Sequence, residues 1–175
     1  DALKIGQRLY VNYCASCHGS DAGGAPGFPN LADNDWLYGG DPDTIKSSIL
    51  DGRPQMAAGQ AGMPPMGAAV GGEQGVKEVA NYVRSLSGLP HDSALAEAGK
   101  AKFAACAGCH GVDGSGNQAL GAPNLTDDVW LYGSSIGVIS KTISEGRKGV
   151  MPAHRDFLGE DKVHLLATYV YSLSK

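Results

Sequence analysis

The sequence has no long apolar run, no cluster of basic residues and no cysteine outside two short motifs. A helix that crosses a bilayer needs about 20 predominantly apolar residues, and no segment approaches that length. The formal net charge is −4 and positive residues are not concentrated anywhere, so nothing indicates nucleic-acid binding. No alternating strand pattern persists either, and this favours an all-α fold.

No signal-peptide pattern is visible in the sequence, yet it begins at Asp1 rather than at methionine. We therefore expect a processed mature protein or a soluble piece of a larger one. Only 18% of the residues are charged and 26 are glycine. We expect small domains of this composition to bury too little surface to fold unaided. The composition thus predicts that a bound group supplies part of the missing apolar surface.

All four cysteines lie in two copies of Cys-x-x-Cys-His, at residues 14–18 and 106–110. This spacing is the attachment signature of c-type haem. Two thiols one helical turn apart can each add across a haem vinyl group, and the adjacent histidine then lies under the iron. We predict two covalently attached haem c groups, with these ligands: Cys14, Cys17 and His18 for the first, and Cys106, Cys109 and His110 for the second.

Two other kinds of site can be built from four cysteines. Two disulfides would suit an oxidising compartment, and two Cys-x-x-Cys pairs could bind zinc. Neither explains why a histidine and then a glycine follow each pair directly. No metal is assigned to the three remaining histidines, His91, His154 and His164.

The haem motifs belong to a repeat that spans both halves of the chain. Each half continues with Pro-Asn-Leu, then Trp-Leu-Tyr-Gly, then Gly-Arg, and closes on a segment with the apolar period of a helix, at 76–86 and 163–173. Glycine and proline interrupt the pattern between the halves. We therefore predict two tandem domains resembling class I cytochromes c, at 1–88 and 89–175, with a linker at about 87–93.

Methionine is the second iron ligand expected in each half, because a His–Met pair raises the reduction potential of an electron-transfer haem. The second half has one methionine, Met151, which precedes a proline and lies 18 residues before Tyr169. Met63 also precedes a proline and lies 19 residues before Tyr82, whereas Met66 lies 16 residues before it. We predict Met63 for the first haem and Met151 for the second, with Met66 as the alternative to Met63.

Other repeated residues are suited to hold the haem and its ligands. A proline carbonyl can accept a hydrogen bond from the second ring nitrogen of each histidine and so fix the imidazole, although both prolines could be ordinary turn residues. Indole and guanidinium donors can bind haem propionates, although both tryptophans could be plain core. The candidates are Pro29, Pro123, Trp36, Trp130, Arg53 and Arg147.

Together these motifs resemble the dihaem subunit of cbb3-type cytochrome c oxidases, most clearly at 27–31, 34–40 and 121–133. The resemblance covers nearly the whole chain. It departs from the family pattern in the first methionine loop, which carries an insertion within 55–62 and has Met66 where a tryptophan is common. It implies haem domains on the periplasmic side of the bacterial inner membrane, held there by an N-terminal anchor absent from this sequence. It also implies electron transfer from a soluble cytochrome c, through the oxidase core subunits, toward a haem–copper centre.

Two other functions remain open at this point. A free periplasmic dihaem cytochrome c would shuttle electrons through the same sites to different partners. A dihaem peroxidase would need an iron with an open distal position and nearby acid–base groups, and a methionine for each haem argues against it. We therefore expect an electron-transfer protein without chemistry of its own rather than an enzyme.

Overall fold

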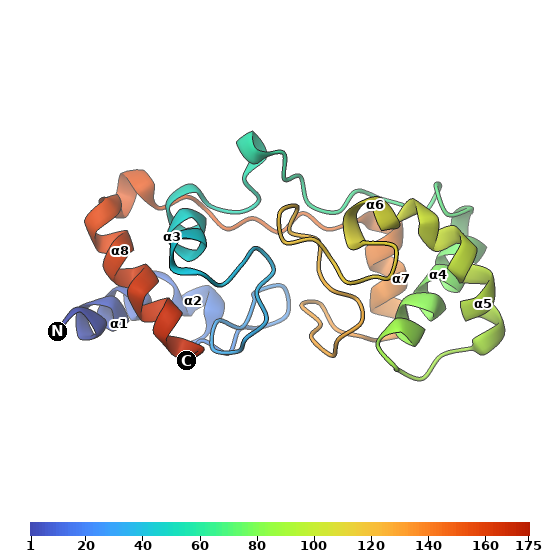
Figure 1. Cartoon of the computed structure of the whole chain (residues 1–175), viewed down its shortest axis with the longest axis horizontal. Coiled ribbons are helices and arrows are strands. Elements are labelled where there is room, and N and C mark those ends of the chain that lie inside the picture. The colour runs from blue at the N-terminus through green and yellow to red at the C-terminus, as the bar shows by residue number, and fades with distance from the viewer. The chain divides into compact units, whose positions relative to one another are not determined.

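The computed structural model describes residues 1–175, which form helices joined by glycine-rich loops, without β-strands (Figure 1). The α-helices are α1 (Ala2–Tyr13), α2 (Ala15–His18), α3 (Pro42–Asp51), α4 (Gly72–Leu86), α5 (Ser93–Lys102), α6 (Ala107–His110), α7 (Ile136–Glu145) and α8 (Arg155–Leu173). Two short 3-10 helices are η1 (Met56–Ala58) and η2 (Phe103–Ala105). The helical fold expected from the sequence is therefore present. None of these helices combines the length and the apolar character that a bilayer crossing requires.

Helices α3 and α7 occupy equivalent places in the repeat, and they begin and end in the same way. The carboxylate of Asp41 accepts a hydrogen bond from the backbone N–H of Thr44, and the hydroxyl of Ser135 caps α7 correspondingly. Both helices end at a glycine with positive φ, Gly52 at 72° and Gly146 at 74°. The backbone therefore has the same conformation at the end of both helices, directly before the arginine of the Gly-Arg motif in each half.

The chain folds into two compact units that are not its two sequence halves. The first unit comprises residues 1–60 and 149–175, and the second comprises 61–148. In the first unit the red helix α8 packs on α1 and α3, and in the second the green helix α4 packs on α5 and α7 (Figure 1). The expected domains, 1–88 and 89–175, therefore differ from the units of the structure.

The repeat itself explains why the boundary predicted from the sequence lies elsewhere. The last long helix of each half, α4 or α8, carries the same apolar stripe, and we refer to these two as the closing helices. The first helices of the two halves, α1 and α5, also resemble one another. Each closing helix therefore has two similar helices on which it could pack. The order of the repeat predicts α1 with α4 and α5 with α8, whereas in the structure α8 packs on α1 and α4 packs on α5.

The closing helices approach their N-terminal partners closely in both units. A Cβ at Gly6 of α1 would lie 2.6 Å from the Cβ of Tyr169 on α8, and one at Gly99 of α5 would collide with the carbonyl oxygen of Glu78 on α4. Only glycine permits helices to pack at this distance. Equivalent aromatic pairs accompany the contact, with ring centroids 5.6 Å apart for Tyr10–Tyr169 and 5.2 Å apart for Tyr82–Phe103.

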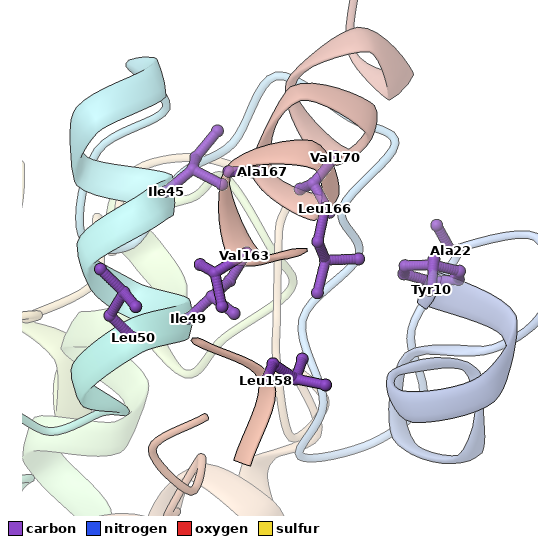
Figure 2. Packing of buried hydrophobic residues seen from close by; sticks show 10 residues of the cluster. All are labelled: Tyr10, Ala22, Ile45, Ile49, Leu50, Leu158, Val163, Leu166, Ala167 and Val170. Carbon is purple, nitrogen blue, oxygen red and sulfur yellow. The ribbon is translucent and has the colours of Figure 1, made fainter. Parts of the chain in front are cut away.

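Each unit has its own hydrophobic core around these helices. Figure 2 shows the core of the first unit, with side chains of α3 and α8 facing one another and Tyr10 reaching in from α1. Its buried residues are Tyr10, Ala22, Ile45, Ile49, Leu50, Leu158, Val163, Leu166, Ala167 and Val170. The core of the second unit consists of Val70, Val76, Val79, Ala80, Val83, Phe103, Ile139 and Ile143.

Candidate haem-binding sites

Each Cys-x-x-Cys-His motif forms a single helical turn, which follows α1 in the first unit and follows α5 and η2 in the second. The backbone N–H of His18 donates to the carbonyl of Cys14 at 2.9 Å, and the equivalent bond from His110 to Cys106 is 3.0 Å. In each turn the first thiol is half-buried at the edge of the core and the second is exposed, and none of the four is in a disulfide. Two thiols on one turn can therefore both reach a flat group that lies against this edge.

The half-buried thiols are held in their neutral form in the chain without haem. Burial, with a smaller contribution from the neighbouring Cys17, raises the pKa of the Cys14 thiol to about 11. Burial likewise raises the pKa of Cys106. Zinc binds the thiolate rather than the thiol, so this environment does not favour a zinc site at either motif.

Both motif histidines are buried, and one ring nitrogen of each is already engaged. Nδ1 of His18 lies 2.9 Å from the carbonyl oxygen of Pro29, and Nδ1 of His110 lies 3.1 Å from that of Pro123. A carbonyl oxygen only accepts, so Nδ1 carries the proton and Nε2 keeps its lone pair for a metal. Burial lowers the pKa of His110 despite the opposing hydrogen bond to Pro123, which favours the neutral ligand form. The expected contact with a proline carbonyl is present in both units.

A glycine-dependent loop brings each proline back beneath its histidine. Gly24 donates its N–H to the carbonyl of His18 at 2.8 Å, and Gly116 donates to that of His110 at 2.7 Å. Both glycines have positive φ, and a Cβ on Gly24 would lie 2.8 Å from the carbonyl carbon of Pro29. The loop therefore needs glycine both for its conformation and for the space it occupies.

The methionines lie in the units opposite to those that we predicted. Met151 packs with Cys14 and Trp36 against the core of the first unit, which contains His18. Met63 and Met66 pack with the second motif against the core of the other unit. Pairing Met63 with the first haem and Met151 with the second therefore does not match their placement, because the closing helices carry the methionine loops with them.

Reciprocal backbone hydrogen bonds fix each methionine loop against the Gly-Arg segment of the other half. Arg53 and Met151 exchange N–H to carbonyl bonds of 3.0 and 2.8 Å, and Met63 and Arg147 exchange bonds of 3.0 and 2.8 Å. Three residues further on, the N–H of His154 donates to Ile49 at 3.0 Å, and that of Met66 donates to Ile143 at 2.8 Å. In this register Met63 is the counterpart of Met151, and Met66 is the counterpart of His154.

The two Gly-Arg arginines are held in place by neighbours of the same kind. The guanidinium of Arg53 lies 4.3 Å from the ring centre of Tyr38, and that of Arg147 lies 4.1 Å from Tyr132. Nε of Arg53 also donates to the hydroxyl of Ser48 at 2.9 Å. The two tyrosines were not among the predicted site residues, although their repeated place in Trp-Leu-Tyr-Gly was a visible signal.

The insertion in the first methionine loop provides a further contact to one arginine. The side-chain oxygen of the buried Gln60 accepts hydrogen bonds from Nη1 of Arg53 at 3.1 Å and from the N–H of Gln55 at 3.0 Å. The shorter loop of the other half has no counterpart to this glutamine. The inserted segment therefore folds back on Arg53, a contact that was not predicted from the sequence.

Trp130 provides the clearest test of whether a haem fits the second unit. Its Nε1 is buried and has no hydrogen-bond acceptor in the chain. A buried N–H without a partner costs roughly 1–3 kcal/mol, so such a donor normally faces a bound group. A haem propionate supplies an acceptor of the right charge, and Trp130 packs against the same core as Cys106 and Met63. The residues present therefore fit a haem.

These paired sites on an all-α scaffold are those of a c-type cytochrome. The chain belongs to the family described as cytochrome c oxidase, cbb3-type, subunit III, whose model matches residues 1–83 and 94–170. Membership in this family implies covalently bound haem c.

Curated relatives agree over almost the entire chain. The chain is 52% identical over 174 residues to the cbb3-type cytochrome c oxidase subunit CcoP of Rubrivivax gelatinosus, covering 99% of this chain and 55% of that protein. It is 46% identical to subunit FixP of Bradyrhizobium diazoefficiens and 40% identical to subunit CcoP of Cereibacter sphaeroides, with 98% of this chain and 61% of each relative covered. The chain thus spans little more than half the length of these relatives.

Proposed function

We propose that this chain is a dihaem cytochrome c that passes electrons from a soluble cytochrome c toward the haem–copper centre of a cbb3-type oxidase. Its partners would be that donor and the oxidase core subunits, on the periplasmic side of the bacterial inner membrane. Attachment to the membrane would depend on an N-terminal anchor, as the family resemblance implies. The chain would have no catalytic residue of its own.

The observation that carries this proposal is the duplication of one complete ligand arrangement. Each unit contains two thiols on one helical turn, an imidazole fixed by a proline carbonyl, and a methionine loop against the same core. A bound haem would supply the one-electron Fe(III)/Fe(II) couple. A histidine and a methionine would supply both iron ligands in each unit, which would suit electron transfer and would leave no coordination position for a peroxide substrate.

The test is whether the haem-loaded full chain accepts electrons from the donor and passes them to the oxidase core, measured by rapid mixing. Reduced soluble cytochrome c should reduce both haems of the chain. The reduced chain should then restore oxygen consumption to an oxidase core that lacks this subunit. Two haems per chain are expected from haem quantitation and from the intact mass.

Two results would contradict the proposal in different ways. A chain that accepts electrons but neither binds nor reduces the core would point to the free shuttle instead. Rapid turnover of hydrogen peroxide by the chain alone would favour the peroxidase.

A further inference from the structure

We propose that His154 binds the first haem through its ring, with Nδ1–H donating a hydrogen bond to a haem propionate. The inference rests on the haem attachment proposed above, and it gives a binding role to a histidine outside both Cys-x-x-Cys-His motifs. The first haem would then receive a donor from the methionine loop of its unit, as the second would from Trp130.

The observation that carries this inference is a buried ring nitrogen without a partner. Nδ1 of His154 is buried and makes no hydrogen bond in the chain. Besides Oε2 of Glu78, which faces the ammonium of Lys102 in an ion pair, the other buried side-chain atom in this state is Nε1 of Trp130. Each compact unit therefore contains one such nitrogen, which costs roughly 1–3 kcal/mol unless a bound group pairs with it.

The register of the methionine loops gives the direction of the imidazole. The N–H of His154 donates to the carbonyl of Ile49, and Met66 makes the equivalent bond in the second unit. The side chain of Met66 packs against the second core, as the first thiol of the second motif does. The same direction takes the imidazole of His154 to the edge of the first core, where Cys14 and Met151 pack.

The charged groups closest to His154 in the loop and its neighbours already have partners. The guanidinium of Arg155 binds Asp51 at 2.6 Å and Glu160 at 3.1 Å. The guanidinium of Arg53 donates to a serine hydroxyl and a glutamine amide oxygen. None of these groups contacts Nδ1 of His154, so its partner is a bound group rather than a side chain.

The chemistry of haem leaves one kind of partner for this nitrogen. Apart from its iron, a haem offers hydrogen-bonding atoms only in its two propionates, and the rest of its edge is apolar. His18 and Met151 would supply the ligands of the iron in the first unit. Because a carboxylate only accepts, Nδ1 would carry the proton, and the bond would be charge-assisted. It would neutralise part of the propionate charge and so raise the potential of the first haem.

The experiment is a potentiometric titration of the haem-loaded full chain with three substitutions at His154. Asparagine places its amide nitrogen close to the position of Nδ1, whereas glutamine places its amide nitrogen close to that of Nε2. His154→Asn should therefore keep both potentials. His154→Gln and His154→Leu should lower one of the two, because a propionate that keeps its full charge stabilises Fe(III). Trp130→Phe should lower the other potential.

A control and a spectroscopic measurement separate this role from a structural one. His164→Leu removes an exposed imidazole from α8 of the same unit and should leave both potentials unchanged. All variants should keep the methionine–Fe(III) charge-transfer band and bind carbon monoxide slowly, since no iron ligand is replaced.

Several outcomes would overturn the proposal. Unchanged potentials in His154→Leu would do so, as would equal falls in all three His154 variants, because the donor position would then not matter. Loss of the charge-transfer band in His154→Leu would assign this histidine to the iron instead. A chain that binds no haem would contradict the proposed function rather than the role of His154.

Discussion

At the scale of single residues, the equivalence of Met63 and Met151 rests on backbone bonds rather than on distance along the chain. Sequence spacing left Met63 and Met66 as alternatives, since both lie near the expected distance from Tyr82. The bond from Met66 to Ile143 matches that from His154 to Ile49, which places Met66 beyond the ligand position. The structure thus supports Met63 as the ligand.

The different places of Met63 and Met66 predict that replacing each of them with leucine has a different effect. Met63→Leu should convert one of the two haems to a five-coordinate or weakly ligated form, because leucine offers iron no donor. Met66→Leu should leave both haems six-coordinate and cost less than about 1.5 kcal/mol in the free energy of unfolding, since it nearly conserves volume. Visible spectra and carbon monoxide titration of both variants check this. Equal loss of methionine ligation in the Met66 variant would contradict the assignment.

The unpaired indole N–H of Trp130 leads to a second prediction at this scale. Trp130→Phe removes a donor that should neutralise part of a propionate charge, so Fe(III) gains stability relative to Fe(II). The potential of that haem should fall, while the other haem keeps its own. The interaction lost is a charge-assisted hydrogen bond of about 1.5–3 kcal/mol, of which only the part that differs between oxidation states appears in the potential. A potentiometric titration that finds both potentials unchanged would remove Trp130 from the propionate contacts.

Single residues were predictable where the repeat itself carried the signal. The proline carbonyls were expected because a ligand imidazole needs an acceptor and a proline recurs after each motif. Gln60 was not predictable, because it lies in a segment that occurs once and contacts Arg53 only after the loop folds back. Tyr38 and Tyr132 belong to the repeated Trp-Leu-Tyr-Gly motif, but their contact with the arginines could not be predicted, because it depends on how the chain folds in three dimensions.

At the scale of elements, the glycine that ends α3 sets the position of the methionine loop. Gly52→Ala places a Cβ against the Met151 carbonyl and a side chain at φ 72° and ψ −176°, a region that is essentially confined to glycine and costs other residues about 1–3 kcal/mol. The variant should unfold at lower temperature and lose methionine ligation at one haem. Gly159→Ala is the matched control, because its φ of 74° and ψ of 165° lie in the same region as those of Gly52, but nothing lies within 4 Å of the added Cβ. Thermal melts followed at the charge-transfer band should separate the two, and equal effects would contradict the seating of the loop on Gly52.

The contact between α4 and α5 contains a buried carboxylate whose charge should make stability depend on pH. Hydrogen bonds from Lys102 and Gln74 hold the pKa of the Glu78 carboxyl below its usual 4.5. A carboxyl whose pKa is lowered by folding stabilises the fold at pH values above its pKa in the unfolded chain. This contribution disappears as the pH falls through its pKa in the folded chain. Glu78→Gln should therefore lower the melting temperature at pH 7, and the difference from wild type should shrink below about pH 4.5.

An exposed pair on the same helix provides the control for that prediction. Glu73 accepts a hydrogen bond from Lys77 at 2.8 Å, and its side chain is 85% exposed. Ion pairs in water contribute about 0–1 kcal/mol, so Glu73→Gln should leave the melting temperature nearly unchanged at both pH values. If both variants behaved alike, the Glu78 pair would not be a specific link between α4 and α5.

The elements themselves were largely predictable, but their partners were not. The apolar stripe in each closing segment predicted α4 and α8. Which closing helix covers which N-terminal helix depends on a choice between two nearly identical surfaces. Local pattern carries no information on that choice, because Tyr82 and Tyr169 offer the same ring to Phe103 and Tyr10.

At the scale of the whole molecule, the exchange makes each compact unit a product of both halves of the repeat. Residues 1–60 need 149–175 to complete a core, and 61–148 bring the first methionine loop together with the second motif. Haem attachment at either motif would therefore stabilise segments that are distant in the sequence. Under the proposed function, two haems in one chain would allow a stepwise path from donor to oxidase.

A spectroscopic redox titration of the haem-loaded chain, with carbon monoxide added to the reduced form, tests the central claim most directly. We expect two one-electron haems per chain, both six-coordinate with histidine and methionine and both slow to bind carbon monoxide. Rapid stoichiometric carbon monoxide uptake by either haem, or a titration that detects a single haem per chain, would contradict it.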